Sequence, residues 1–396
     1  MKAPIYATPL LAAFFCSPTL AISFSSGESP NFQANTTVPA NITVPANITV
    51  PANITVPANT SVLANTTVLA NTYVSGGDSA IVYGNVIAKT YASTGNGSII
   101  HGDFRSGDVT TLGYGATVNG NVESKGAGNA GANTLITGDL VTGGVGTMGA
   151  SAHVEGSFIS GLAGTIGANA ILEGNWEVGV GSIAAASASS NKINSDAIDT
   201  DNEFLNSVKA NIDSDMITAT NELIGAKAAL SDMASTEMTL SATFVTDGTL
   251  FAGVYDAASW STAAGTTLTL DGEGLDDAIW VFNIDDVLAF GSDSTVELVN
   301  AGNNAQIFWN IGSVSSPGGY ASLGDGADVL GIIIAEDYVT VGANATVMHA
   351  SEADGNCAAI YSTTSYVSIG ANAVVGSACL PCTFRSSMHI PFFDAY

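Results

Sequence analysis

Positive charge is the scarcest feature of this 396-residue chain. Lys and Arg together number 8, against 35 Asp and Glu, which gives a formal net charge of −27. A chain with so few cations and such a negative field does not favour binding to nucleic acid or to anionic lipid, so we expect neither partner. Charged residues make up only 11% of the chain and hydrophobic residues 46%, which excludes a disordered polyelectrolyte.

Residues for catalysis and metal binding are also few. The four His do not stand at a spacing typical of metal ligands. The glycine-rich segments lack the Lys-Ser/Thr of a phosphate-binding loop, and no Ser-His-Asp or Cys-His arrangement can be defined. The acid pairs Asp276-Asp277 and Asp285-Asp286 are typical of solvated turns, with weak calcium ligation as the alternative. We therefore expect no enzyme, no cofactor and no metal site.

Apolar runs long enough to span a membrane are missing beyond the N-terminus. Lys2, the apolar residues 5–15 and the small residues around Ala21 predict a signal peptide over residues 1–21, and hence a secreted, extracellular protein. A buried N-terminal strand is the alternative interpretation.

Cysteine is rare as well, and three Cys remain after such a signal peptide. In an oxidising compartment we expect Cys357 to pair with Cys379 or Cys382. The Cys379-Leu-Pro-Cys382 spacing also fits redox or metal chemistry. We assign residues 379–396 to a C-terminal tail.

Repeats dominate what is present. Residues 39–74 repeat every six residues, with Ala, Ile and Val alternating with Pro, Asn and Thr, which is typical of a strand with one apolar face. Six such hexads can form two triangular coils or a stiff extended stalk, because Pro cannot donate to a strand ladder. We assign residues 22–75 to this hexad segment.

Residues 76–190 repeat every 18 residues. Two glycine columns recur at this period: Gly84, Gly102, Gly120, Gly138, Gly156 and Gly174, then Gly95, Gly113, Gly131, Gly149 and Gly167. Aliphatic or aromatic residues stand two positions before and after each glycine of the first column. The pattern predicts an all-β fold, a triangular parallel β-helix (β-solenoid) with 18-residue coils whose chain bends at glycine.

One long helix is expected within residues 196–235. Apolar residues recur there every three or four positions, from Leu205 to Met233, and acidic residues gather at the N-terminal end. The apolar stripe predicts a helix packed alongside the solenoid, with a coiled-coil dimer as the alternative. Short strands and the same bend motif resume after it, as in Val341-Gly-Ala-Asn-Ala345. We therefore assign residues 191–378 to a second domain, without deciding whether the chain forms one solenoid or two.

This second domain resembles the ice-binding-like family of bacterial, algal and fungal adhesion and antifreeze proteins. The resemblance covers about residues 190–378. It rests on the order of a long helix, Thr267-Leu-Thr-Leu-Asp-Gly272, Asp277-Ala-Ile-Trp-Val-Phe-Asn-Ile284, Asn304-Ala-Gln-Ile-Phe-Trp-Asn-Ile311 and the coil Val339–Val347. It implies a discontinuous triangular β-helix flanked by a helix, with a flat face that binds ice. The regular block before it resembles hexapeptide or bactofilin-like solenoids instead.

Small polar residues mark a candidate binding face. They precede each glycine bend, as Ser93, Thr111, Asn129, Thr147 and Thr165 in the first block and as Ser322, Thr340 and Ser368 in the second. Alternation turns them outward wherever the next residue points into the core, so stacked coils make a flat, uncharged ladder of hydroxyls and methyls. A neighbouring outward set with Thr267, Thr269 and Thr346 is a second candidate, and Thr and Ser are also common on strands for packing reasons alone.

The sequence thus favours a secreted protein whose partner is the surface of an ice crystal, and which slows ice growth and recrystallisation. The alternative is a cell-surface or matrix structural and adhesion protein, in which exposed strand edges lead to end-to-end self-association. A carbohydrate-active enzyme on a solenoid is the least favoured, because cationic residues near a carboxylate cluster are missing.

Overall fold

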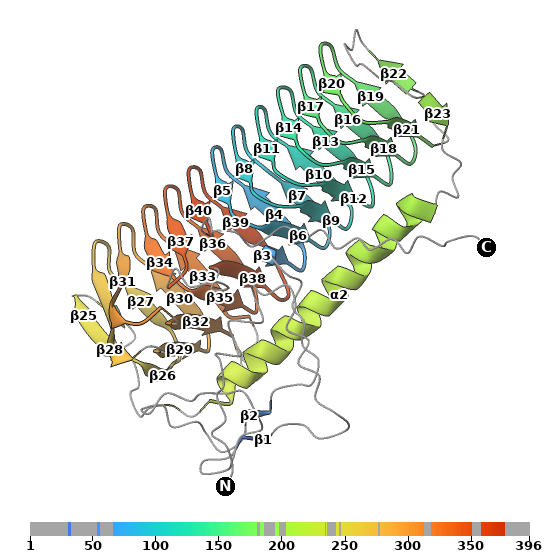
Figure 1. Cartoon of the computed structure of the whole chain (residues 1–396). Helices are drawn as coiled ribbons and strands as arrows, with labels where there is room; N and C mark the ends of the chain where they lie inside the picture. The colour runs from blue at the N-terminus through green and yellow to red at the C-terminus, as the bar shows by residue number, and fades with distance from the viewer. Residues whose placement is uncertain are drawn as a thin grey trace.

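The computed structural model describes residues 66–179, 203–233, 247–275, 278–303, 305–312, 318–350 and 358–376, together with residues 31–32, 54–55, 183–185, 195–197, 235 and 243–244. The expected signal peptide, most of the hexad segment, the three candidate disulfide Cys and the C-terminal tail lie outside these residues. Three long parallel sheets form the sides of a triangular stack of coils (Figure 1). A short antiparallel pair, β1 (Asn31–Phe32) and β2 (Ile54–Thr55), is separate from them.

The first sheet faces the helix, and we call it the helix-covered sheet. In spatial order its strands are β23 (Ser195–Ala197), β21 (Trp176–Val178), β18 (Phe158–Ser160), β15 (Leu140–Thr142), β12 (Val122–Ser124), β9 (Phe104–Ser106), β6 (Asn85–Ala88), β3 (Thr66–Ala70), β38 (Ala359–Ser362), β35 (Ile332–Ala335), β32 (Gln306–Ile311), β29 (Ile279–Ile284) and β26 (Gly253–Ala257). The residues that the helix packs against lie on its strands from β18 to β26.

The second sheet carries the side-chain column described below, and we call it the ladder sheet. Its strands are β22 (Ile183–Ala185), β19 (Gly164–Ile166), β16 (Gly146–Met148), β13 (Gly128–Ala130), β10 (Val109–Leu112), β7 (Tyr91–Ser93), β4 (Tyr73–Gly76), β39 (Val367–Ile369), β36 (Val339–Val341), β33 (Tyr320–Leu323), β30 (Val287–Phe290), β27 (Trp260–Thr262) and β24 (Thr243–Phe244). The helix does not pack against the described side chains of this sheet.

The third sheet has strands of two residues in the first block and strands of up to nine residues in the second. They are β20 (Ile171–Leu172), β17 (His153–Val154), β14 (Leu135–Ile136), β11 (Thr117–Val118), β8 (Ile99–Ile100), β5 (Ile81–Val82), β40 (Val374–Val375), β37 (Thr346–Met348), β34 (Asp328–Leu330), β31 (Thr295–Ala301), β28 (Thr267–Leu275) and β25 (Gly248–Phe251). All three sheets are parallel throughout, as the sequence predicts for a triangular β-helix.

The stack is continuous, but the chain does not follow it from end to end. The described coils begin in the middle at β3, β4 and β5, and the 18-residue block climbs to β20 and β21 at one end. After the helix, the second block starts at the opposite end with β24, β25 and β26 and coils back to the middle. There β38, β39 and β40 pair with β3, β4 and β5, so Ser362 lies beside Ala70 and Ile369 beside Gly76. The two repeat blocks therefore share one solenoid, and we call the junction between β38–β40 and β3–β5 the seam.

Close contact between coils explains the glycine columns. A Cβ added to Gly102 would lie 2.5 Å from the carbonyl carbon of Gly84 in the coil below, and one added to Gly113 would lie 2.4 Å from that of Gly95. Only glycine allows the backbones to approach this closely.

The Gly-Ala-Asn-Ala bend motif has a second requirement. Its Asn takes positive φ in both blocks, 57° at Asn169 and 57° at Asn344, where the chain turns from the ladder sheet to the third sheet. Asn is among the residues that tolerate this left-handed conformation best, so the motif predicts the same corner in both halves of the chain.

The side chains that point inward fill the triangle. Each coil contributes apolar residues from all three sheets, and large aromatic residues stack along the axis. In the second block, the ring centroids of Phe282 and Trp309 are 4.1 Å apart. In the first block, glycine on the ladder sheet leaves room for aromatic rings from the helix-covered sheet: a Cβ added to Gly146 would lie 2.4 Å from Cε2 of Phe158. This exchange of large and small residues keeps the cross-section constant along the stack.

The helix α2 (Glu203–Ser231) lies along the helix-covered sheet (Figure 1). Leu205, Val208 and Ile212 pack on Val141 and Ile159 of the first block. Met216, Ala219, Leu223 and Leu230 form a second cluster with residues that include Leu69, Val281 and Phe308. A helix of 29 residues is about 43 Å long, and the ten strand steps from β18 to β26 span about 48 Å. The helix thus carries the chain back along the stack and covers one of its three faces.

Candidate functional site

The ladder sheet carries one continuous outward column of small polar residues. Leaving out its end strands β24 and β22, the column occupies eleven strands in unbroken register. In order it reads Ser261, Ala289, Ser322, Thr340, Ser368, Ser75, Ser93, Thr111, Asn129, Thr147 and Thr165. Only Ala289 and Asn129 lack a hydroxyl. Ten steps between parallel strands extend this ladder over about 48 Å.

Alternation along each strand orients the ladder. In β10, Thr110 and Leu112 are buried while Thr111 between them is partly exposed, and β36 shows the same pattern around Thr340. Neighbouring members also contact each other, since the Thr340 hydroxyl donates to Oγ of Ser322 at 3.2 Å. Partial burial and this hydrogen bond restrict the rotamers of Thr340 and Ser322.

The structure brings together the candidates from both repeat blocks. The residues Thr111, Thr147 and Thr165 and the residues Ser322, Thr340 and Ser368 belong to the same column, which passes through the seam. Sequence analysis missed Ser75, the member that joins them, although Ser75-Gly76 lies 18 residues before Ser93. It also missed Ser261, whose surroundings do not contain the bend motif.

A second outward column lies two residues earlier on the same strands. In the middle of the sheet it consists of tyrosines, such as Tyr338 and Tyr73. Toward β19 it changes to small aliphatic residues, namely Val109, Ala127, Val145 and Ala163. Neither column contains a charged residue between β33 and β19. The strands β10, β13, β16 and β19 therefore present two adjacent rows of small uncharged side chains, while the middle strands present larger rings.

The other candidate residues lie on the third sheet. Thr267 and Thr269 are on β28, and Thr346 is on β37. The Thr269 hydroxyl donates to Oε1 of Glu297 at 2.6 Å, and the Thr346 hydroxyl donates to Oδ1 of Asp328 at 2.7 Å. These two hydroxyls are engaged by carboxylates, so this part of the third sheet is charged where the ladder sheet is not.

Ion pairs attach the helix to the first block on the side away from the ladder. Arg105 on β9 contacts Glu123 at 2.9 Å and Asp215 of the helix at 3.1 Å. Burial raises the pKa of the Glu123 carboxyl, and the nearby Arg105 guanidinium partly opposes this. The Lys125 ammonium also pairs with Asp213 of the helix at 2.6 Å. Two of the three cations in residues 76–190 thus anchor the helix rather than forming a binding site.

A buried lysine anchors the other end of the helix. Nζ of Lys227 donates to Oδ1 of Asn310 at 2.9 Å, to the carbonyl of Gly312 at 2.9 Å and to the carbonyl of Ile311 at 2.5 Å. Burial lowers the pKa of Lys227 to about 8, against a smaller raising effect of Glu336. The Asn310 amide completes the junction by donating to the carbonyl of Lys227 at 3.2 Å.

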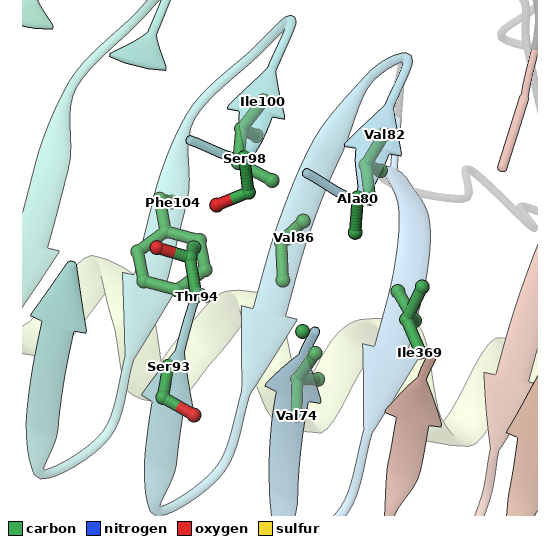
Figure 2. Close-up of a pocket in the computed structure, with 11 residues that line it drawn as sticks. Val74, Ala80, Val82, Val86, Ser93, Thr94, Ser98, Ile100, Phe104 and Ile369 are labelled. Carbon is green, nitrogen blue, oxygen red and sulfur yellow. The ribbon is translucent and has the colours of Figure 1, made fainter. Parts of the chain in front are cut away.

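The interior offers little space for a ligand at the seam. A cavity of about 10 Å³ lies beneath the ladder sheet. Figure 2 shows the residues that line it, among them Val74, Ile369 and Phe104. A volume of this size holds about one water molecule. The outer surface is thus the more suitable place for a binding site.

Within the described ranges, no group of three or more His, Cys, Asp or Glu side chains is arranged to hold a metal ion. Asp285 and Asp286 lie in an exposed turn between β29 and β30, as expected for solvated acids. Helix α2 is the only helix in the described part of the chain, and it contains no stretch apolar enough to cross a membrane.

The parallel coils, the covering helix and the polar ladder define a β-solenoid with a single helix along one face. It is discontinuous in the sense that the order of the coils along the stack does not follow the order of the chain. The family model described as ice-binding-like matches residues 125–375. The chain belongs to this ice-binding-like family. The match begins inside the regular 18-residue block, earlier than the resemblance seen in the sequence alone.

Solved structures give a weaker likeness. An ice-binding protein from the Antarctic ascomycete Antarctomyces psychrotrophicus is 16% identical, with 78% of this chain and 93% of that chain covered and a TM-score of 0.39. An ice-binding protein from an Antarctic biological consortium is 17% identical, with 86% and 99% covered and a TM-score of 0.37. A glycosylated ice-binding protein from an Arctic yeast is 18% identical, with 57% and 91% covered and a TM-score of 0.34. No curated protein sequence matches the chain.

Proposed function

We propose that the protein binds ice through the outer face of the ladder sheet, and that it adsorbs to crystals, blocks their growth and inhibits recrystallisation. The observation that carries this proposal is the in-register column of hydroxyls that passes through both repeat blocks without a charged residue. Each methyl holds ordered water beside it and each hydroxyl joins that water by hydrogen bonds. A rigid row with strand spacing lets such water merge with the ice lattice, and no covalent chemistry or cofactor is needed.

The part of the ladder sheet best suited to a flat crystal surface lies on β10, β13, β16 and β19. There Thr111, Asn129, Thr147 and Thr165 stand beside a row of small aliphatic residues, so two columns have similar height. In the middle of the sheet, the residues beside Thr340 and Ser368 are tyrosines, whose rings are much larger than the hydroxyl side chains. We therefore assign the main contact to the first block, with Ser322, Thr340 and Ser368 extending the same face.

The third sheet is the less suitable face. The hydroxyls of Thr269 and Thr346 already donate to carboxylates, and charged groups retain their own hydration water. If variants on the ladder sheet keep full activity, Thr267, Thr269 and Thr346 become the candidate ice-binding residues. The extracellular location expected from the N-terminal segment belongs to this proposal as well, since ice forms outside cells first.

The test is ice-affinity partition and recrystallisation inhibition with the purified protein and two matched variants. We expect the wild-type protein to enter ice and to keep crystals small. Thr147→Lys places a long charged side chain in the centre of the proposed face and should reduce recrystallisation inhibition at least tenfold. Thr117→Lys makes the same change on the third sheet, at an outward position of β11 in the first block, and should leave activity near the wild-type value.

Each outcome has a separate meaning. Loss of activity in Thr117→Lys with full activity in Thr147→Lys would move the face to the third sheet. Thr340→Lys tests the assignment to the first block, because it should reduce activity less than Thr147→Lys does. Wild-type protein that leaves ice growth unchanged, together with filaments in micrographs, would support the structural and adhesion alternative.

A further inference from the structure

Five successive strands of the ladder sheet carry a row of tyrosines. The row consists of Tyr320, Tyr338, Tyr366, Tyr73 and Tyr91, and we call it the tyrosine row. The ring centroids of Tyr320 and Tyr338 are 4.6 Å apart, those of Tyr338 and Tyr366 are 5.1 Å apart, and those of Tyr366 and Tyr73 are 4.7 Å apart. Tyr91 is the register partner of Tyr73. Such an arrangement arises because each ring precedes a ladder residue by two positions in its own coil.

Stacking limits what these rings can do. At the three stacked contacts, the ring faces are occupied by neighbouring rings, so a sugar or a planar ligand cannot lie against them. The parts left to solvent are ring edges and phenol oxygens. Tyr73 and Tyr91 are each 38% exposed. Chemistry at the ring edge is therefore more accessible than binding at the ring face.

The row also crosses the seam. Tyr366 precedes β39, in the last coil of the second block, and Tyr73 opens β4, in the first described coil of the first block. Their rings are almost parallel, with an interplanar angle of 3°. Within the described residues, the seam is held by the strand pairs β38–β3, β39–β4 and β40–β5, by hydrogen bonds such as Asn71 to Thr363, and by core packing, all of them noncovalent.

We propose that the tyrosine row is a site of oxidative cross-linking, at which Tyr366 and Tyr73 couple to dityrosine and join the two ends of the solenoid chain covalently. The oxidant is hydrogen peroxide used by a haem peroxidase. One electron and the hydroxyl proton leave each phenol, which gives two phenoxyl radicals with unpaired spin on the carbons next to the C–O carbon. One carbon–carbon bond forms between these carbons, and their two hydrogens move to the oxygens to restore two phenols. The protein loses two hydrogens in total, and the peroxide is reduced to two waters.

Chain connectivity, rather than ring distance, distinguishes this pair from the other two stacked contacts, whose centroids are 4.6 and 5.1 Å apart. The radicals must meet before they are quenched, and rings already in contact across two strands need only turn about their side-chain bonds. The outward side of the ladder sheet leaves room for this turn. A bond between Tyr73 and Tyr366 closes a far longer segment of chain than one between Tyr320 and Tyr338, which are a single coil apart. Cross-links that close long segments restrict the unfolded chain most, so this one stabilises the solenoid most.

The experiment uses the full-length protein at low concentration, treated with a haem peroxidase and hydrogen peroxide. We expect blue dityrosine fluorescence in a monomeric product. Mass spectrometry of its digest should show a peptide pair that joins Tyr73 to Tyr366 with the loss of two hydrogens. The midpoint of thermal unfolding should rise by roughly 5 °C or more.

Two variants separate geometry from exposure. Tyr366→Phe keeps the stacked ring but removes the phenol, and it should lose both the Tyr73–Tyr366 peptide pair and the thermal gain. Tyr114→Phe removes a more exposed tyrosine outside the row, 60% exposed, and should change neither. The proposal is overturned if the product consists of intermolecular dimers, if coupling joins only Tyr320 to Tyr338 or Tyr338 to Tyr366, or if Tyr366→Phe gives the wild-type yield of the Tyr73 cross-link. Ice-affinity partition of the untreated protein tests the proposed function independently of these outcomes.

Discussion

Replacement of Lys227 by Met should abolish a rise in the free energy of unfolding that the wild-type protein shows between about pH 8 and pH 10.5. The Lys227 ammonium is enclosed between helix α2 and the ends of β32 and β35, where burial lowers its pKa from 10.5 to about 8. Between these two values the unfolded state binds more protons than the folded state. The free energy of unfolding of the wild-type protein must therefore rise with pH through this window.

The size of the effect follows from the two pKa values. A lowering from 10.5 to about 8 corresponds to about 3 kcal/mol. This cost of burying the charge is fully present below pH 8 and is relieved as Lys227 loses its proton. We expect the wild-type protein to gain about 2 kcal/mol between pH 7.5 and pH 10, relative to a variant without this amine.

The assay is urea unfolding across this pH range for the wild type, Lys227→Met and Lys209→Met. The second variant removes a lysine from the same helix, at a position outside the Lys227 contacts, and should keep the wild-type slope. Effects of pH on other groups are common to all three proteins and cancel in the comparison. If the wild type and Lys227→Met give parallel curves of free energy against pH, the buried ammonium is not the cause and our account of the helix junction is wrong.

Two further predictions concern the coil geometry. Gly146→Ala should lower the free energy of unfolding by about 1–3 kcal/mol, because its Cβ would lie 2.4 Å from the ring of Phe158; Gly76→Ala, where the nearest atom is 3.5 Å away, should stay near the wild type in the same urea titration. Asp139→Ala should cost about 1 kcal/mol because Oδ1 of Asp139 accepts the Ser157 amide at 2.7 Å, and Asp139→Asn should restore most of it. Equal stability of the Ala and Asn variants would show that this bond between coils is not a net stabilising contact.

Local repetition made much of the fold predictable. The glycine columns, the 18-residue period and the Gly-Ala-Asn-Ala bends each reflect a constraint inside one coil or between consecutive coils, and these constraints recur in the sequence. The apolar stripe from Leu205 to Met233 likewise predicts a helix with one buried face, and α2 occupies Glu203–Ser231 within the expected range. The outward direction of Thr111 and Thr340 could be predicted because alternation is a property of a single strand.

The order of the coils could not be predicted in this way. Strand β39 pairs with β36 on one side and with β4 on the other. The pairing with β4 joins residues almost 300 positions apart, and no local sequence pattern encodes it. The union of two short polar columns into one ladder, and of separate tyrosines into one stacked row, depends on it entirely. Which sheet is covered is also decided by tertiary contacts, because helix α2 packs against Val281, Phe308 and Asn310 of one sheet. The sequence by itself thus determined the coil and its chemistry, since these depend on near neighbours, while only the tertiary structure decided which faces meet, which is covered and which is left for a partner.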